Sequence, residues 1–137
     1  MITLSQYAGQ WRGTPIWTPA LEANAMRLLT SVNALEADMA RMGVRFPDNP
    51  HTRNGISGEL YGGFRPPDCP IGAMGSAHKK AQAVDRYDPF ADIDAWCLAH
   101  LDRLEVHGIW IEHPEATPGW SHWACVAPKS GNRVFRP

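Results

Sequence analysis

The chain has 137 residues, of which 44% are hydrophobic and 20% charged, a composition typical of one globular domain and not of a disordered chain or a coiled coil. Thirteen basic residues stand against fourteen acidic ones, so the excess of Lys and Arg that nonspecific nucleic-acid binding or a polybasic membrane patch requires is missing. We therefore expect a single domain over residues 1–137 that acts as a monomer and binds no nucleic acid.

The first predicted element is a long helix between Thr18 and Gly43. Thr18 can accept a backbone N–H as the N-cap, and Pro19 needs no hydrogen bond at the first helical position. Gly43 is a natural C-terminal stop. Apolar residues follow at helical spacing and predict a face buried in the core: Leu21, Ala25, Leu28, Leu29, Val32, Leu35, Met39 and Met42.

The other predicted elements are shorter. Residues 1–17 show no clear period, and the prolines of residues 65–70 exclude regular structure there. A second helix is predicted over residues 89–107, with Gly108 as its stop. Strands are predicted over residues 44–46, 56–64, 81–87, 109–111, 120–126 and 134–135. Helices among short strands without a βαβ period indicate an α+β fold.

No run of about eighteen apolar residues occurs, so no membrane span is expected. Residues 1–11 lack a basic segment followed by an apolar stretch, so we expect synthesis in the cytoplasm without a signal peptide. The three cysteines, Cys69, Cys97 and Cys125, form no CxxC pair, and this excludes a zinc ribbon.

Three residues could form a catalytic zinc site, which takes three protein ligands and leaves a fourth position open. His78 and Asp85 come from one loop-to-strand segment, and His122 comes from a distant strand. The spacing alone is weak evidence. Taken singly, His78 is better explained as a loop histidine, Asp85 as a turn carboxylate and His122 as a histidine on the exposed face of a strand.

Three ordered motifs add to this pattern. Residues 76–85 carry Ser76, His78, Ala83 and Asp85 at the positions of a Ser-x-His-x-x-Gly-x-Ala-x-Asp motif. Gly63-Phe64-Arg65 lies upstream, and Trp120-Ser121-His122 lies downstream. In these elements the chain resembles the zinc D-Ala-D-Ala carboxypeptidases, D-Ala-D-Ala dipeptidases and phage L-alanyl-D-glutamate endolysins of the hedgehog/DD-peptidase fold. The resemblance covers residues 63–122.

The resemblance implies a small antiparallel sheet with helices packed on one side, and a Zn²⁺ ion held by His78, Asp85 and His122. It implies hydrolysis of an amide bond in peptidoglycan stem peptides by metal-activated water, as a carboxypeptidase or an endopeptidase. Arg65 would stabilise the oxyanion or bind a substrate carboxylate, and Ser76 would contact substrate or shape its loop. As a phage or prophage protein, the chain would act on the cell wall once released.

Two positions depart from the family pattern. Ala81 stands where the family usually has Gly, and a methyl group is tolerable there only if the backbone does not need a positive φ. Gly119 stands where many members place the catalytic Glu, so Glu112 becomes the candidate general base, with Glu115 and His113 in reserve. Trp110, Trp120 and Trp123 are candidates for the walls of the cleft, and we expect at least two of them to pack in the core instead.

Two alternatives stay open. The missing Glu at position 119 also fits an inactive family member that serves as a cell-wall-binding or structural module. A structural zinc site is the other alternative, and it would need a fourth ligand from Cys125 or His113.

Overall fold

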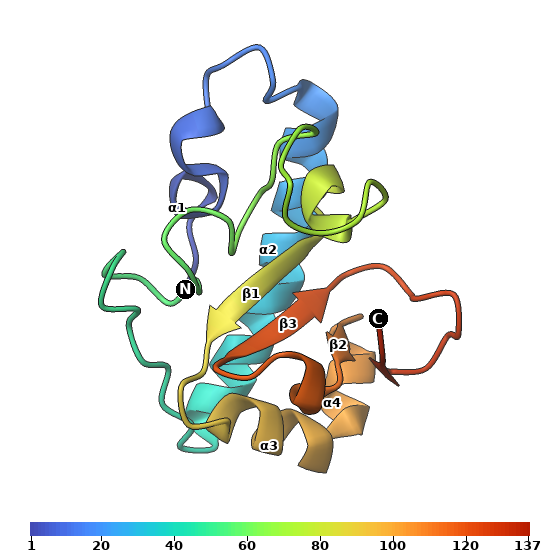
Figure 1. Ribbon diagram of the computed structural model, residues 1–137. Helices are drawn as coiled ribbons and strands as arrows, with labels where there is room; N and C mark the ends of the chain where they lie inside the picture. Colours follow the sequence, from blue (N-terminus) through green and yellow to red (C-terminus); the bar gives the residue numbers. More distant parts are fainter.

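The computed structural model describes residues 1–137 and shows a mixed α+β fold, as the sequence predicts, with one long helix lying across a four-stranded sheet (Figure 1). The helices are α1 (Leu4–Ala8), α2 (Pro19–Arg41), α3 (Asp92–Ala99) and α4 (Leu101–Val106), and the strands are β1 (Ala83–Tyr87), β2 (Trp110–Glu112), β3 (Trp120–Ala124) and β4 (Val134–Phe135). Single 3₁₀ turns cover Gly9–Trp11, Ala77–Lys80 and Pro114–Ala116.

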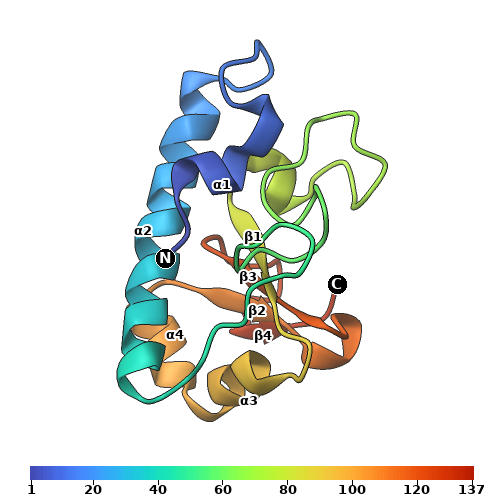
Figure 2. The ribbon, with the colours of Figure 1, turned by 90° about the vertical axis from the view of Figure 1, so that its left-hand side faces the viewer.

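Helix α2 forms where the sequence predicts it. The Thr18 side chain accepts a hydrogen bond from the Leu21 backbone N–H, and Pro19 opens the helix. The helix covers one face of the sheet (Figure 2). Its predicted stripe is buried from Ala25 through Met39, in a hydrophobic core of 22 residues that also takes in side chains from the N-terminal segment and the sheet. None of the helices combines the length and the apolar character needed to cross a bilayer.

The strands run in the order β1-β3-β2-β4. Strands β1, β3 and β2 pair antiparallel, whereas β2 and β4 pair parallel through Ile111 with Val134 and Glu112 with Phe135. The sheet is therefore mixed, and not wholly antiparallel as the resemblance implied. Packing of helices on one side holds for α2, whereas α3 lies at one end of the sheet in both views (Figures 1 and 2).

The predicted helix over residues 89–107 is two helices, because the backbone leaves the helical region at His100 (φ −133°, ψ 51°). The His100 ring binds the Trp96 carbonyl at 2.8 Å, the group that a continuing helix would have paired with the His100 N–H. Helix α3 begins only at Asp92, where the Asp88 carboxylate accepts hydrogen bonds from the N–H groups of Ile93 and Asp94.

The N-terminal segment contains a helix that the search for periodicity missed. Thr3 and Gln6 form a reciprocal capping box for α1, which buries Tyr7 and Ala8. The strands predicted over residues 44–46 and 56–64 are absent. Residues 58–61 form a turn followed by a bend at residues 62 and 63, and only Ile56 makes a bridge, to Arg86.

Candidate metal centre

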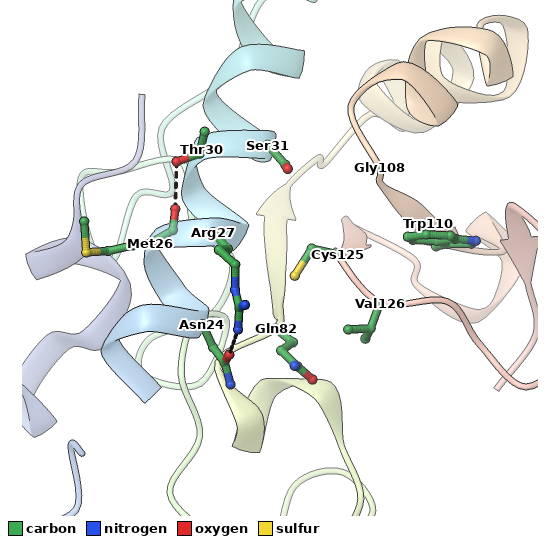
Figure 3. A pocket seen from close by; sticks show the side chains of 10 residues that line it. All are labelled: Asn24, Met26, Arg27, Thr30, Ser31, Gln82, Gly108, Trp110, Cys125 and Val126. Atoms are coloured by element: carbon green, nitrogen blue, oxygen red, sulfur yellow. Dashed lines mark hydrogen bonds between the residues drawn. The ribbon is translucent and has the colours of Figure 1, made fainter. Parts of the chain in front are cut away.

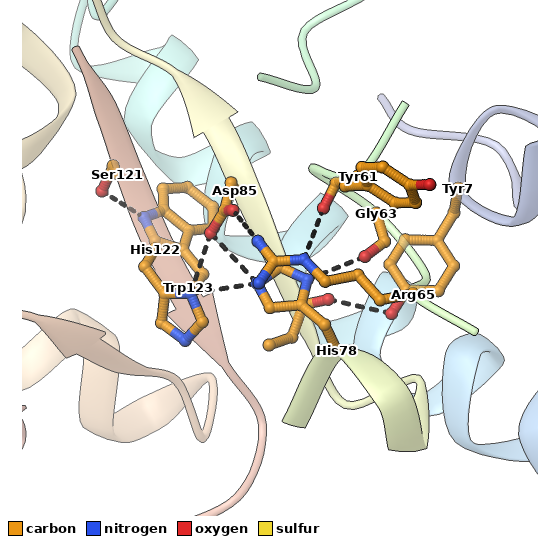
Figure 4. A network of polar contacts seen from close by, with 10 residues as sticks. Tyr7, Tyr61, Gly63, Arg65, His78, Asp85, Ser121, His122 and Trp123 are labelled. Atoms are coloured by element: carbon orange, nitrogen blue, oxygen red, sulfur yellow. Dashed lines mark hydrogen bonds and ion pairs between the residues drawn. The ribbon is translucent and has the colours of Figure 1, made fainter. Parts of the chain in front are cut away.

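His78, Asp85 and His122 meet on the face of the sheet that α2 leaves uncovered. Asp85 on β1 stands directly opposite His122 on β3, and His78 lies on the 3₁₀ turn that leads into β1. Asp85 Oδ1 is 2.8 Å from His122 Nδ1 and 3.2 Å from His78 Nε2, and the two ring nitrogens are 3.2 Å apart (Figure 4). The three predicted ligands therefore present one atom each to a common point.

The hydrogen bond at Nδ1 of His78 determines whether Nε2 has a free lone pair. His78 Nδ1 lies 2.7 Å from the Gly63 carbonyl oxygen, which only accepts, so this nitrogen carries a proton. Burial lowers the pKa of His78, against the opposing effect of Asp85, so the ring is neutral near pH 7. Nε2 then points a lone pair at a carboxylate oxygen, an arrangement that a cation between them would stabilise.

Asp85 uses its two oxygens differently. Oδ2 accepts a hydrogen bond of 2.9 Å from Arg65 Nη2, while Oδ1 faces the two histidines. Burial acts to raise the pKa of Asp85, but the neighbouring His78 and His122 outweigh it and hold the pKa well below its ordinary value. The carboxylate is therefore ionised throughout the physiological range.

The distances fit zinc coordination. Bonds of about 2.0–2.1 Å place neighbouring ligand atoms of a tetrahedral site roughly 3.3 Å apart. The three distances between the candidate ligand atoms, 2.8, 3.2 and 3.2 Å, need only small shifts to reach that spacing. The Gly63 carbonyl behind His78 and Arg65 behind Asp85 orient these two ligands from outside.

No fourth His, Cys, Asp or Glu joins the group. Cys125 lies in a separate cavity of about 790 Å³ between α2 and the ends of β2 and β3, beside residues such as Arg27 and Trp110 (Figure 3). His113 instead accepts a hydrogen bond from the Glu115 N–H. Neither candidate for the fourth ligand of a structural zinc site is in place, and three ligands are the arrangement of catalytic sites.

The group formed by His78, Asp85 and His122 opens into a cleft of about 810 Å³, whose lining includes Arg65, Ser76 and Glu112. Arg65 is fixed by a 2.7 Å hydrogen bond from Nε to the Tyr61 carbonyl and by its contact with Asp85. Ser76 is half-buried at the start of the 3₁₀ turn, and its hydroxyl makes no capping hydrogen bond. The cleft thus brings all six predicted site residues together.

Glu112 is the only one of the three candidate bases that lines this cleft. Strands β2 and β3 pair Ile111 with Trp123, so one step further in this register brings Glu112 level with His122 on the same face. Burial raises the pKa of Glu112, nearby Asp85 adds to the rise, and His122 and Arg65 oppose it. Glu115 is exposed and paired with Arg136 instead.

The structure shows the backbone conformation at both positions that depart from the motifs of the resembled family. Ala81 has φ 55° and ψ 40°, so the backbone does adopt the left-handed conformation that glycine favours, with the methyl group fully buried. Gly119 lies in the turn before β3 at φ 93° and does not line the cleft.

The three tryptophans have separate positions. Trp120 lines the cleft, Trp123 is fully buried in the core, and Trp110 stacks beneath Arg133 with 4.2 Å between guanidinium carbon and ring centre. Only one of them therefore walls the cleft.

Sequence reasoning missed the backbone groups that support the site. A Cβ atom at Gly63 would come within 2.4 Å of the Tyr7 carbonyl oxygen in α1, so only glycine fits at this position. The carbonyl of the same residue is the one that contacts His78 Nδ1. Tyr7 in turn donates its hydroxyl proton to the Ala83 carbonyl at 2.8 Å, next to Val84 and Asp85. The sequence does contain one signal for this helix: the capping box formed by Thr3 and Gln6 predicts a helix that includes Tyr7.

Comparisons with protein-family models, with curated proteins and with solved structures find no match for this chain.

Proposed function

We propose that the chain is a zinc-dependent peptidase that hydrolyses an amide bond in peptidoglycan stem peptides. The observation that carries the proposal is the His78–Asp85–His122 triangle, which opens on one side into a cleft that also holds Arg65 and Glu112. Three ligands with an open side are typical of hydrolytic zinc sites.

Zinc held by these ligands would supply Lewis acidity, activating water near neutral pH and polarising a carbonyl group. Glu112 is placed to accept the proton of the attacking water and to pass it to the leaving amine, because its half-buried carboxylate is level with His122. Its raised pKa suits a group that both takes and returns a proton.

Arg65 is suited to one hydrogen bond to a developing oxyanion. Nε and Nη2 are occupied by Tyr61 and Asp85, so Nη1 is the nitrogen free of these contacts. A positively charged donor can stabilise an oxyanion, and the charge of Arg65 is already paired with Asp85, which weakens its attraction for a substrate carboxylate. The substrate class in this proposal rests on the resemblance of residues 63–122 to the peptidoglycan peptidases.

The absence of a Glu at position 119 favours a second candidate, an inactive relative that binds metal and cell-wall peptide without turnover. Because Gly119 lies outside the cleft, a base would have to come from another element, and Glu112 is the carboxylate available. The two candidates therefore differ in what Glu112 does.

The test measures zinc content and hydrolysis of purified peptidoglycan with the zinc-loaded wild type, His122→Ala and the control His51→Ala. His51 lies outside the cluster with its side chain 63% exposed. We expect about one zinc per chain and released peptide fragments from the wild type and the control, and neither from His122→Ala.

Unchanged hydrolysis in His122→Ala would overturn the proposal. Zinc binding that disappears in His122→Ala, without product from any peptide, would identify the inactive relative. Loss of folding in His122→Ala would show in its circular dichroism, and His122→Gln then replaces it as the variant.

A further inference from the structure

A second cavity adjoins the cleft beside the candidate metal ligands. It has a volume of about 410 Å³ and is bounded by the turns of residues 57–62. Four residues line both cavities: Arg65, Ile71, Asp85 and Trp120. The two cavities therefore adjoin at Asp85, and we call the pair the groove.

The groove follows β3. Trp120, His122 and Ala124 alternate onto the outer face of the strand, and all three line the cleft. Trp120 also lines the second cavity, whereas the cleft continues past Ala124 to Val126 and Lys129. His122 thus lies between the two halves of the groove, and space extends from the metal ligands in both directions along the strand.

The two halves differ in chemistry. The half beyond Ala124 contains Lys80 and Lys129, two of the chain's three lysines, and neither forms an ion pair. The half beside Trp120 is bounded by Leu60, Tyr61 and Ile71, with Leu60 44% and Ile71 48% exposed, and its lining also includes the acidic Glu59.

We propose that the substrate chain runs through the groove along β3, so that the protein cuts an internal amide bond, with an acidic group of the substrate held by Lys80 and Lys129. The half beside Trp120, which contains no lysine, then holds an uncharged part of the substrate on the other side of the bond. This inference rests on the proposed function and selects an endopeptidase over a carboxypeptidase.

Two observations oppose a carboxypeptidase. Such an enzyme needs the groove to end just beyond the metal, yet here it continues on both sides of His122. It also needs a cation beside the metal for the terminal carboxylate, and the charge of Arg65 is already paired with the Asp85 carboxylate. The unpaired lysines lie further along the groove. A carboxylate on a substrate side chain, or one several bonds from the cleaved amide, would reach them there.

The test uses a synthetic stem peptide that is acetylated at its N-terminus and amidated at its C-terminus, with its glutamate carboxylate either free or amidated. Free-ended versions of both peptides are run alongside. We expect cleavage of the blocked peptides, and a preference of roughly fivefold in kcat/KM for the free glutamate carboxylate, as two exposed ion pairs would provide. Added salt should reduce that preference.

The preference should disappear in the Lys80→Ala, Lys129→Ala double variant and persist in Lys79→Ala. Lys79 is the matched control because it is adjacent in sequence and does not line the groove. Cleavage of the free-ended peptides alone would overturn the endopeptidase inference and leave the peptidase proposal standing. An equal preference in the double variant and the wild type would overturn the role of the lysines, and no cleavage of any peptide would overturn the peptidase proposal itself.

Discussion

Asp85 and His122 face each other across the β1–β3 pair, with Asp85 Oδ1 2.8 Å from His122 Nδ1. The register that pairs Ala83 with Ala124 fixes this contact. A slip of one residue would turn His122 into the core and Trp123 into the cleft, so burial of Trp123 holds the ligand in place. Core packing on one face of β3 thus positions the metal ligand on the other.

Asp85→Asn should weaken zinc binding by more than the ~10–100-fold that loss of an outer partner of a ligand causes. The amide keeps the shape of the side chain but removes the charge that faces His78 and His122, and it leaves Arg65 without its anionic partner. The zinc dissociation constant, measured by competition with a chelator, checks this. Asp102→Asn is the control, because that side chain is 78% exposed, and a similar loss there would contradict the assignment.

Glu112→Gln should lower kcat by about 10²–10⁴-fold and leave zinc content unchanged, because the amide cannot accept the proton of the attacking water. Steady-state kinetics and metal analysis on the same preparation test both parts. Glu105→Gln, an exposed carboxylate on α4, is the control. Full activity in Glu112→Gln together with a loss in Glu115→Gln would transfer the role of base to Glu115.

Ala81→Gly should cost much less stability than Ala25→Gly, although both methyl groups are fully buried. In α2, Ala25→Gly loses about 1 kcal/mol of helix propensity and about 0.8 kcal/mol of methyl burial. Ala81→Gly loses a similar burial but relieves about 1 kcal/mol or more of left-handed strain at φ 55°. Urea unfolding of both variants measures the difference, and equal losses would show that Ala81 is not strained.

Asp94→Asn should gain stability relative to the wild type as the pH rises from about 4 to about 7. Burial raises the pKa of Asp94 from 3.8 to about 6, with Asp88 adding to the rise and a hydrogen bond to Ser121 opposing it. Between these values the folded state binds more protons than the unfolded state, so wild-type stability falls as the pH rises. Asn removes this titration.

The measurement for Asp94 is the free energy of unfolding of both proteins across that pH range, with Asp102→Asn as the exposed control. Other groups titrate in the same window, but they do so in both proteins, and the difference isolates Asp94. Asp94 Oδ1 is also buried without a hydrogen-bond partner, which is consistent with a protonated acid in the fold. A constant difference would contradict the raised pKa.

The sequence alone determined the elements whose signals are local. Helix α2 follows from a cap at Thr18 and a stripe of helical period, and the three candidate metal ligands follow from motifs in a fixed order. Helix α1 had a local signal too, the Thr3–Gln6 capping box, which a search for longer periodicity overlooks. Apolar spacing failed at His100, where a side chain competes with the backbone: the His100 ring binds the Trp96 carbonyl, four residues earlier in the chain, where α3 ends.

Tertiary structure alone decided the features that depend on strand pairing. Glu112 and Glu115 are three residues apart and chemically equivalent, and only the β2–β3 register separates the carboxylate beside His122 from the one paired with Arg136. The same holds for the parallel pairing of β4. Such features are set by contacts between residues distant in the chain, and the spacing of neighbouring residues carries no information about them.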